Sequence, residues 1–419
     1  MEIEKLHIDY IKTAFQKMQT KEALLDLLNY AKPLIYGDKS VPFTINQITW
    51  YSNPKLNNNR YIDFKIKKKS GGQRTIHAPT NGLKAIQKTL NLIFQCVFEP
   101  HKSAMGFVAN KSIVDNAKLH TNRNYVYNID LKDFFSSIDQ ARVWKCLQLE
   151  PFNLIDKKPV PEMLAKVLGY NKQKVLNIIT VLCCTEMEVE RFNTETSEYE
   201  KVKRNVLPQG APTSPTLTNV VCQKLDIRLN GVAKRFGLRY SRYADDITFS
   251  SMHDVYKKDG EFINEINRII IDQGFEIKES KTRLQKTGFC QEVTGLVVNE
   301  NANVQQRYIK QLRMWLYYWE RYGYDKAYYF FFQQYMTDKG NIVKGKPNME
   351  NVIGGKLNYL KMVKGADNEM FLKLKNRFDL LVDKPIDLPI RQNHLDNVLE
   401  LLFDKGLVEA MNFYKPKSE

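Results

Sequence analysis

The chain has 419 residues, more than one hydrophobic core usually serves, so two or three structural units are expected. Hydrophobic residues make up 43% and aromatic residues 11%, which excludes a disordered chain. Lysine and arginine total 63 against 47 acidic residues, and the resulting charge of +16 favours a polyanionic partner, with nucleic acid more strongly indicated than a membrane surface.

Composition also limits the cellular setting. No apolar run is long enough to span a bilayer, and the first ten residues lack the apolar stretch of a signal peptide, so we expect no membrane partner and a cytoplasmic location. The six cysteines form no C-x-x-C pair. They are predicted to be buried free thiols rather than zinc ligands or disulfides.

The first third of the chain changes from helix to strand and back. Residues 1 to about 50 are predicted to be helical, with an amphipathic leucine face before Pro33. Residues 61–67 alternate as a strand, a Gly-Gly turn follows, and residues 74–77 return, which predicts a hairpin with a basic tip. Residues 81–98 carry apolar side chains at helical spacing.

The middle and end of the chain hold further strands and helices. Residues 125–130 predict a strand that ends at Asp130, and the glutamate-rich residues 186–203 predict an exposed hairpin, with plain solvation as its default role. A helix is expected over 216–236, two strands over 238–243 and 247–250, and an aromatic-striped helix over 304–322. A last helical stretch is expected over 394–407.

Three aspartates lie where predicted strands end or turn. Asp245 and Asp246 are adjacent between apolar strands, and two ionised carboxylates about 4 Å apart repel by about 4 kcal/mol at an effective dielectric near 20, so the pair needs a cation. Asp130 alone would be an ordinary strand-end aspartate. The three together suit Mg²⁺, and two ions are expected, one at the attacking hydroxyl and one at the leaving pyrophosphate.

Three sequence boxes, at residues 128–135, 207–215 and 243–246, occur in the order found in bacterial reverse transcriptases. The chain resembles these enzymes, and most of all the retron type, over roughly residues 60–365. Tyr243-Ala244-Asp245-Asp246 is similar to the Y-x-D-D box, and residues 128–135 (NIDLKDFF) are similar to the first aspartate motif. Residues 207–215 (LPQGAPTSP) are similar to the L-P-Q-G-x-x-x-S-P box.

This resemblance implies roles for individual residues. Asp130 and Asp245 would be the main metal ligands, with Asp246 weaker, and Lys281 would assist pyrophosphate departure. The incoming deoxynucleoside triphosphate would lie against five residues: Lys69, Arg74, Phe135, Gln209 and Gly210. Phe135 would be the ring that excludes a 2′-hydroxyl, whereas Phe134 is expected in the core. The lysines before Arg74 have the alternative of a solvated strand edge.

Two shorter motifs narrow the resemblance to retron enzymes. Asn116 and His120 fit N-A-x-x-H, and Val293-Thr294-Gly295 fits V-T-G, which implies that these five residues bind a cognate structured RNA. His120 has the alternative of a satisfied polar residue at a helix end. Met105 departs from the family, where a histidine often precedes the Gly-Phe pair, and the chain is longer than usual.

The resemblance implies an α+β right-hand polymerase. The expected organisation is an N-terminal helical segment over 1–55, fingers over 56–125, and a palm with interleaved fingers elements over 126–300. A helical thumb follows over 301–378, where exposed cations could track a nucleic-acid backbone, and then a C-terminal extension over 379–419.

The predicted function is RNA-directed DNA synthesis. The partners implied are a structured noncoding RNA that serves as template and primer, its DNA product, deoxynucleoside triphosphates, and a separate effector protein of an antiphage system. Three alternatives stand beside it: a non-retron defence reverse transcriptase using an unusual template or none, an intron or diversity-generating type, and a catalytically silent RNA-binding scaffold. No RNase H-like or endonuclease constellation accompanies the three boxes.

Overall fold

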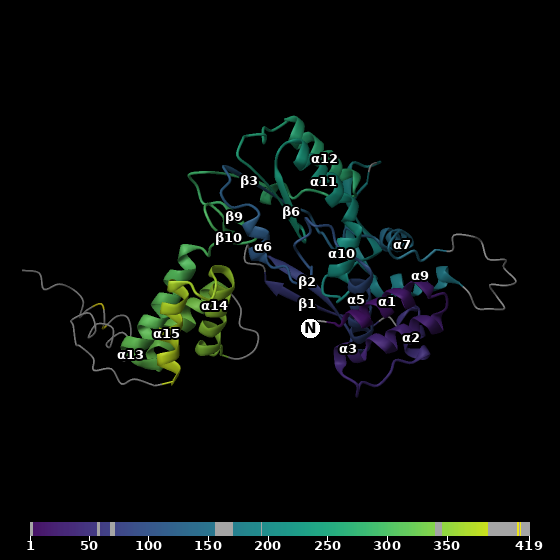
Figure 1. Cartoon of the computed structure of the whole chain (residues 1–419), viewed down its shortest axis with the longest axis horizontal. Coiled ribbons are helices and arrows are strands. Elements are labelled where there is room, and N and C mark those ends of the chain that lie inside the picture. The colour runs from purple at the N-terminus through teal and green to yellow at the C-terminus, as the bar shows by residue number, and fades with distance from the viewer. Residues whose placement is uncertain are drawn as a thin grey trace, which may run out of the picture. The chain divides into compact units, whose positions relative to one another are not determined.

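The computed structural model describes residues 3–56, 59–67, 72–155, 171–193, 195–339 and 346–383, together with residues 409 and 411 (Figure 1). These residues belong to two compact units, divided between Thr294 and Ala302. The predicted palm–thumb boundary at 300/301 lies in this interval. The finer division of the first unit into helical segment, fingers and palm stays a prediction.

The N-terminal segment is helical, as predicted. It consists of α1 (Lys5–Lys17), α2 (Lys21–Ala31), α3 (Pro33–Tyr36) and α4 (Ile45–Tyr51). Thr20 and Thr44 cap α2 and α4 by accepting hydrogen bonds from backbone N–H groups. Ile11 and Phe15 on α1 are fully buried, and α1 packs against α5 (Asn81–Val97) (Figure 1). This contact joins the helical segment to the rest of the first unit.

A β-hairpin follows where the alternation predicts it. Strands β1 (Tyr61–Lys67) and β2 (Gln73–Pro79) pair antiparallel, from Tyr61 opposite Pro79 to Lys67 opposite Gln73. The tip, residues 68–71, lies outside the described residues, and with it the predicted nucleotide-binding Lys69. The N–H of His77 in β2 donates to the Gln209 carbonyl at 2.9 Å, so the hairpin lies beside the 207–215 segment.

A four-stranded antiparallel sheet forms the centre of the first unit. Its order is β6-β7-β3-β8, and its strands are β3 (Tyr125–Asp130), β6 (Arg239–Tyr243), β7 (Asp246–Ser251) and β8 (Arg283–Lys286). The predicted strands over 125–130, 238–243 and 247–250 are all present. Ile129, Ile247 and Phe249 are fully buried, which fixes the register of β3 against β7.

Helices pack against this sheet and against one another. They are α6 (Ile113–Lys118), α7 (Gln140–Gln148), α9 (Lys172–Cys183), α10 (Ser214–Val221), α11 (Gln223–Arg235) and α12 (Glu261–Asp272). The helix predicted over 216–236 is divided at Cys222 into α10 and α11. Both α6 and α11 contact β6, and α11 also contacts α12 (Figure 1).

The predicted acidic hairpin is present as β4 (Thr185–Asn193) and β5 (Glu198–Val206). Its strands pair so that Glu188 lies opposite Lys203 and Glu190 opposite Lys201. Opposite charges across an antiparallel pair stabilise it, so much of the acidic charge is balanced within the hairpin. Phe192 and Tyr199 lie opposite each other near the turn, and each is about half exposed.

The second unit is helical, as expected of a thumb. Its helices are α13 (Gln306–Lys339), α14 (Met349–Lys364) and α15 (Glu369–Asp383). The predicted helix over 304–322 is the first part of α13, which is interrupted at Gly323 (φ 77°, ψ 174°). Leu312, Trp315 and Trp319 are buried, so the aromatic stripe forms core.

Helix α15 and the exposed cations of α13 also belong to the second unit. Helix α15 runs to Asp383, past the position where the C-terminal extension was expected to begin; the predicted helix over 394–407 lies outside the described residues. Arg307, Lys310 and Arg313 are exposed, as a role on a nucleic-acid backbone requires.

Two expectations from composition can be compared with the structure. Four cysteines are buried, but Cys146 is half-buried and Cys290 is exposed, so the prediction of buried thiols is wrong for these two. All six are free, and burial raises the pKa of the Cys183 thiol to about 12. Within the described ranges, no helix combines the length and apolar character needed to cross a bilayer.

Candidate active site

The register of the central sheet brings the predicted aspartates together. Asp130, the last residue of β3, lies directly opposite Asp246, the first residue of β7. The β6–β7 turn consists of Ala244 and Asp245, and Ala244 adopts a left-handed conformation (φ 57°). The N–H of Leu131 donates to the Asp245 carbonyl at 3.0 Å, which ties the turn to the end of β3. Three carboxylates from two distant stretches of sequence therefore gather at one end of the sheet.

The pKa values show how crowded this end of the sheet is with negative charge. Burial raises the pKa of Asp246 to about 7, and the charges of Asp245 and Asp130 add to the effect. Burial likewise raises the pKa of Asp245, with a further contribution from Asp130, against opposing effects of Lys281 and Arg74. A cation held here would favour the ionised form of both carboxylates.

Lys281 lies at the same point. The short 3₁₀ helix η1 (Glu279–Lys281) follows a backbone hydrogen bond from Lys278 N–H to the Asp130 carbonyl at 2.8 Å. From there the Lys281 ammonium contacts the Asp130 carboxylate, with Nζ 2.8 Å from Oδ2. The side chain of Lys281 is 49% exposed, so its charge is open to a phosphate as well.

The donor set fits Mg²⁺ in its chemistry. Carboxylate oxygens are the ligands that Mg²⁺ prefers, and it usually binds one or two of them together with substrate phosphates. Among the described residues, no three or more His, Cys, Asp or Glu side chains are arranged so that they could hold a metal ion, so the three aspartates share one region without forming an assembled metal cluster. The Asp130 carboxylate is instead turned to Lys281, its nearest cation.

The predicted nucleotide-binding residues lie on two neighbouring segments. Gly210 has φ 125°, and a Cβ there would lie 2.8 Å from the His77 carbonyl oxygen, so the close approach of the 207–215 segment to β2 requires glycine. Arg74 on β2 is exposed, and its charge is among those that lower the pKa of Asp245. The structure thus places Arg74 within electrostatic range of Asp245, and places Gln209 and Gly210 beside the strand that carries Arg74.

Phe135 lies in the loop that follows β3. It is half-buried, and its ring centroid lies 6.1 Å from that of Phe107 and 5.6 Å from that of Phe134. Phe134 is 4% exposed and stacks on Phe275, which confirms it as a core residue. Phe135 is therefore the ring of this pair that remains open to a ligand.

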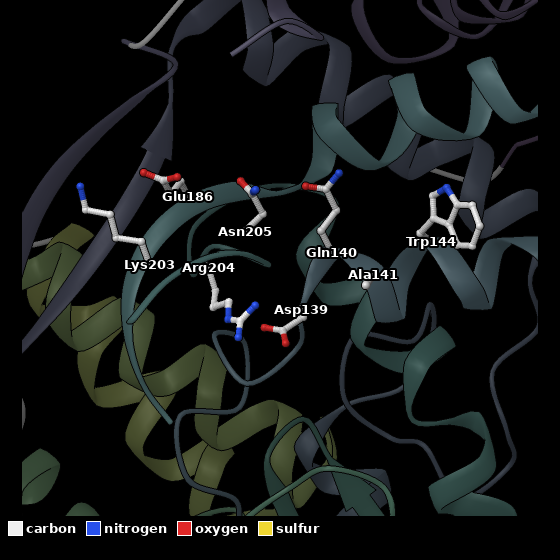
Figure 2. A pocket seen from close by; sticks show the side chains of 8 residues that line it. All are labelled: Asp139, Gln140, Ala141, Trp144, Glu186, Lys203, Arg204 and Asn205. Carbon is white, nitrogen blue, oxygen red and sulfur yellow. The ribbon is translucent and has the colours of Figure 1, made fainter. Parts of the chain in front are cut away.

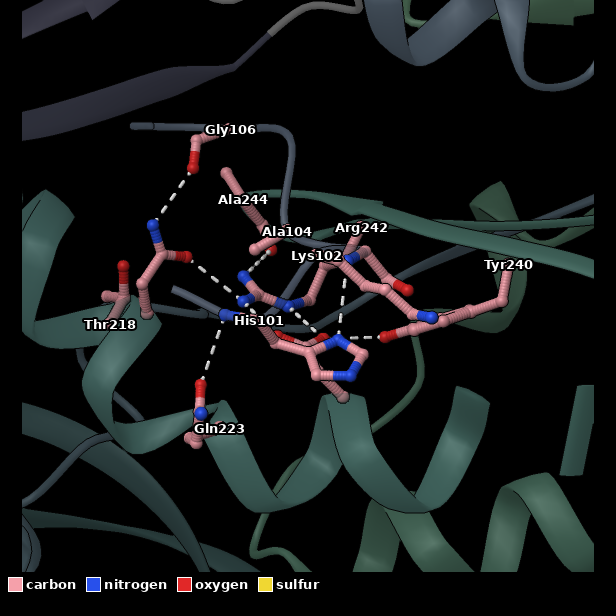
Figure 3. A network of polar contacts seen from close by, with 12 residues as sticks. His101, Lys102, Ala104, Gly106, Thr218, Gln223, Tyr240, Arg242 and Ala244 are labelled. Carbon is pink, nitrogen blue, oxygen red and sulfur yellow. Dashed lines mark hydrogen bonds and ion pairs between the residues drawn. The ribbon is translucent and has the colours of Figure 1, made fainter. Parts of the chain in front are cut away.

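A buried ion pair that the sequence did not predict lies beneath the Y-x-D-D turn (Figure 3). The Arg242 guanidinium makes two hydrogen bonds to the Asp226 carboxylate, at 2.8 and 2.7 Å, and a third to the Asn219 side-chain oxygen at 3.0 Å. Its Nη1 donates to the Ala244 carbonyl at 3.1 Å. Arg242 is fully buried, and although burial alone would lower its pKa, Asp226 keeps that pKa above its ordinary value.

The loop before Phe107 completes the support of the turn. A Cβ on Gly106 would lie 2.5 Å from the Ala244 nitrogen, and the Gly106 carbonyl accepts a hydrogen bond from the Asn219 side chain (Figure 3). Glycine is required here by the close approach of two backbones. A glycine followed by an aromatic residue is a weak signal in sequence, and nothing in the pattern points to Asp226 or Asn219.

Asn116 and His120 of the N-A-x-x-H motif lie in the interior, and their role in RNA binding stays a prediction. His120 is fully buried, and its ring nitrogens lie 2.7 Å from the Ser250 and Ser241 hydroxyls. Asn116, 1% exposed, accepts a hydrogen bond from Ser241 at 2.6 Å. These side chains join α6 to β6 and β7, an arrangement that favours the alternative of a satisfied polar histidine for His120.

The V-T-G motif is divided between interior and surface. Val293 is 1% exposed and belongs to the core, and its role in RNA binding stays a prediction. Thr294 is half-buried and contacts Asn116 and the Ile113 carbonyl at 3.5 and 3.4 Å. Gly295 is exposed, with φ 81°. Of the five residues predicted to bind RNA, Thr294 and Gly295 are the two that are not buried.

Comparison with known families defines the class of protein. Residues 66–311, more than half of the chain, match the family described as "Reverse transcriptase (RNA-dependent DNA polymerase)". The chain belongs to this family, and the predicted α+β right-hand polymerase class is confirmed.

Within the family the chain is similar to retron reverse transcriptases. It is 34% identical to the Mx65 enzyme of Myxococcus xanthus, over 63% of this chain and 57% of that protein. The Mx162 enzyme of the same organism is 33% identical, over 66% of this chain and 56% of that protein. The Ec86 enzyme of Escherichia coli is 32% identical, over 61% of this chain and 68% of that protein. The match thus spans somewhat more than half of each Myxococcus relative.

Proposed function

We propose that this chain is an RNA-directed DNA polymerase that joins deoxynucleotides by two-metal catalysis. The observation that carries the proposal is the β3–β7 register, in which Asp130 lies opposite Asp246 and beside the Asp245 turn. Membership in the reverse transcriptase family supports the same chemistry. When bound, two Mg²⁺ ions would supply an activated primer hydroxyl and a stabilised pyrophosphate leaving group.

The protein side chains would have distinct roles at this site. Asp130 and Asp245 would hold the ions, with Asp246 as an additional ligand. Lys281, already at Asp130, would offer its ammonium to the departing pyrophosphate. The remaining nucleotide contacts would come from Lys69 and Arg74 at the triphosphate, Gln209 and the Gly210 backbone beside the nucleotide, and Phe135 under the sugar.

The template would be a structured noncoding RNA that also provides the primer, with the DNA product joined to it. Similarity to retron reverse transcriptases supports this choice. The half-buried Thr294 and the exposed Gly295 would contact that RNA, while Asn116, His120 and Val293 would position the surface from inside. Action in the cytoplasm with a separate effector protein in antiphage defence belongs to the same proposal.

Primer extension tests the catalytic assignment. Wild type should incorporate deoxynucleotides on an RNA template only when Mg²⁺ is present. Asp245→Ala and Asp246→Ala, singly and together, should reduce incorporation at least about a hundredfold, since they remove charge that the ions need. Asp38→Ala, at an exposed turn of the N-terminal segment, is the matched control and should keep full activity.

The same experiment separates the polymerase from the silent scaffold. Equal incorporation by wild type and the Asp245→Ala/Asp246→Ala variant would refute the catalytic role of these residues. Sequencing the nucleic acid that co-purifies with the protein then identifies the template. One structured RNA joined to DNA supports the retron type, whereas DNA without such a partner supports the non-retron alternative.

A further inference from the structure

The acidic hairpin β4–β5 contacts the loop that carries Phe135, over residues 131–139. At one end of the loop, the Lys132 ammonium lies 4.1 Å from the centre of the Tyr199 ring and 3.7 Å from the Glu190 carboxylate. At the other end, Arg191 donates to the Ser136 carbonyl at 2.7 Å and to the Asp139 carboxylate at 2.9 Å. We call this set of interactions the hairpin–loop contact.

Glu276 is a third partner in the hairpin–loop contact and binds both Tyr199 and Lys132. The Tyr199 hydroxyl donates to the Glu276 carboxylate at 2.9 Å, and the Glu276 carbonyl accepts from the Lys132 N–H at 2.8 Å. The Lys132 ammonium lies 3.8 Å from the same carboxylate. Lys132 is therefore held between the hairpin and the segment that leads to Lys281.

The base of the hairpin continues into the same loop through the backbone. Asp139 forms an isolated antiparallel bridge with Val206, and the Leu207 N–H donates to the Ile138 carbonyl at 3.1 Å. Asp139 and hairpin residues line a common pocket, in which Lys203 extends away from Asp139 (Figure 2). The loop is thus attached to the hairpin near both of its ends, with Phe135 between the two attachments.

We propose that the β4–β5 hairpin positions Phe135 and thereby sets the discrimination between deoxyribonucleotides and ribonucleotides. The inference rests on the proposed function, since Phe135 selects a sugar only if a nucleotide binds beside it. Within the loop itself, Ser137 N–H to Asp133 and Ile138 N–H to Phe135 are the backbone hydrogen bonds, at 2.8 and 3.2 Å. The Ser136 and Ser137 hydroxyls donate to the Asp133 and Phe134 carbonyls at 3.1 and 2.9 Å, and the ring packs against Phe134 and Phe107. The hairpin adds attachments near both ends of the loop, and a displacement of about 1 Å at such a site changes rates strongly.

The first test measures the loop without nucleotide or RNA. In Arg191→Ala, hydrogen exchange of amides in residues 131–139 should be at least about threefold faster than in wild type. Lys203→Ala is the matched control, because it also removes one cation of the hairpin but points away from Asp139 (Figure 2). Arg191→Lys keeps one donor and should fall between. Unchanged exchange in a folded Arg191→Ala protein would overturn the proposal, whatever the enzyme does.

The second test measures selectivity in primer extension. Arg191→Ala should raise the KM for deoxynucleotides and lower the ratio of kcat/KM for deoxyribo- over ribonucleotides by about three- to tenfold, with kcat at saturation changed less than about twofold. Phe135→Ala should lower the same ratio further. Faster exchange with unchanged selectivity would overturn the role in discrimination. Failure of wild type to extend any primer would instead refute the proposed function, and the exchange measurement would still decide whether the hairpin holds the loop.

Discussion

One face of strand β6 buries a neutral polar network, and the other face buries a charged one. Neighbouring strand residues point to opposite faces of a sheet, and Ser241 and Arg242 do so here. Ser241 joins a neutral network with His120 and Asn116, whereas Arg242 joins an ionic one with Asp226. Both networks are buried completely, yet only the ionic one reaches the Y-x-D-D turn, through the Ala244 carbonyl.

Under the proposed function, the ionic network supports the turn at the catalytic end of the sheet, and the neutral network lies behind the proposed RNA surface. A guanidinium with several fixed acceptors holds a backbone turn in one geometry, and it does so at a high cost if one partner is lost. Hydroxyl and imidazole groups connect elements with a smaller penalty for change. The ionic face should therefore be the less tolerant of substitution.

The largest effect is expected at the ionic face. Asp226→Ala leaves the buried Arg242 charge without its carboxylate and should reduce the free energy of unfolding by about 3–5 kcal/mol. The Asp226→Ala/Arg242→Met variant removes both charges and should recover part of this loss. It should still extend primers more slowly, because the Ala244 carbonyl lacks its donor. Urea unfolding of both proteins provides the comparison. A double variant no more stable than Asp226→Ala would show that the unpaired charge is not the cause.

A smaller, pH-dependent effect is expected at the neutral face. Burial, with Arg239 and Arg123 nearby, lowers the pKa of His120 to about 3, from about 6.5 in the unfolded chain. The unfolded chain therefore takes up a proton first, and the stabilisation present above pH 6.5 is lost as the pH falls toward 3. By pH 5 the loss in the free energy of unfolding amounts to about 2 kcal/mol.

Replacement of the ring isolates that contribution. The free energy of unfolding of His120→Gln should fall less between pH 7 and pH 5 than that of wild type. His253→Gln, at an exposed histidine, is the control for histidine removal. A parallel pH dependence in wild type and His120→Gln would mean that His120 is not the group that takes up the proton.

Features that depend on neighbouring residues in the sequence could be predicted, and features that depend on distant residues or on burial could not. Alternation of apolar side chains gave β3, β6 and β7, and because strand pairing is regular, their ends brought Asp130 and Asp245 together as expected. A motif does not report exposure, so the burial of Asn116 and His120 could not be predicted from the N-A-x-x-H pattern. The Arg242–Asp226 pair joins a strand to a helix 16 residues earlier, and a charged residue on an amphipathic helix looks the same in sequence whether solvated or paired inside.

The smallest effect on stability is expected at Thr294. Substitution of this residue also tests the proposed RNA surface most directly. Its hydroxyl contacts are long, 3.4 and 3.5 Å, so Thr294→Val should change the free energy of unfolding by less than about 1 kcal/mol. Affinity for the RNA that co-purifies with wild type should fall about three- to tenfold, because a partly exposed hydroxyl is lost. Val293→Ala is the matched interior control, whose effect on RNA should follow its loss of stability. If Thr294→Val destabilises the fold and leaves affinity intact, Thr294 belongs with His120 inside the sheet, and the RNA surface must lie elsewhere.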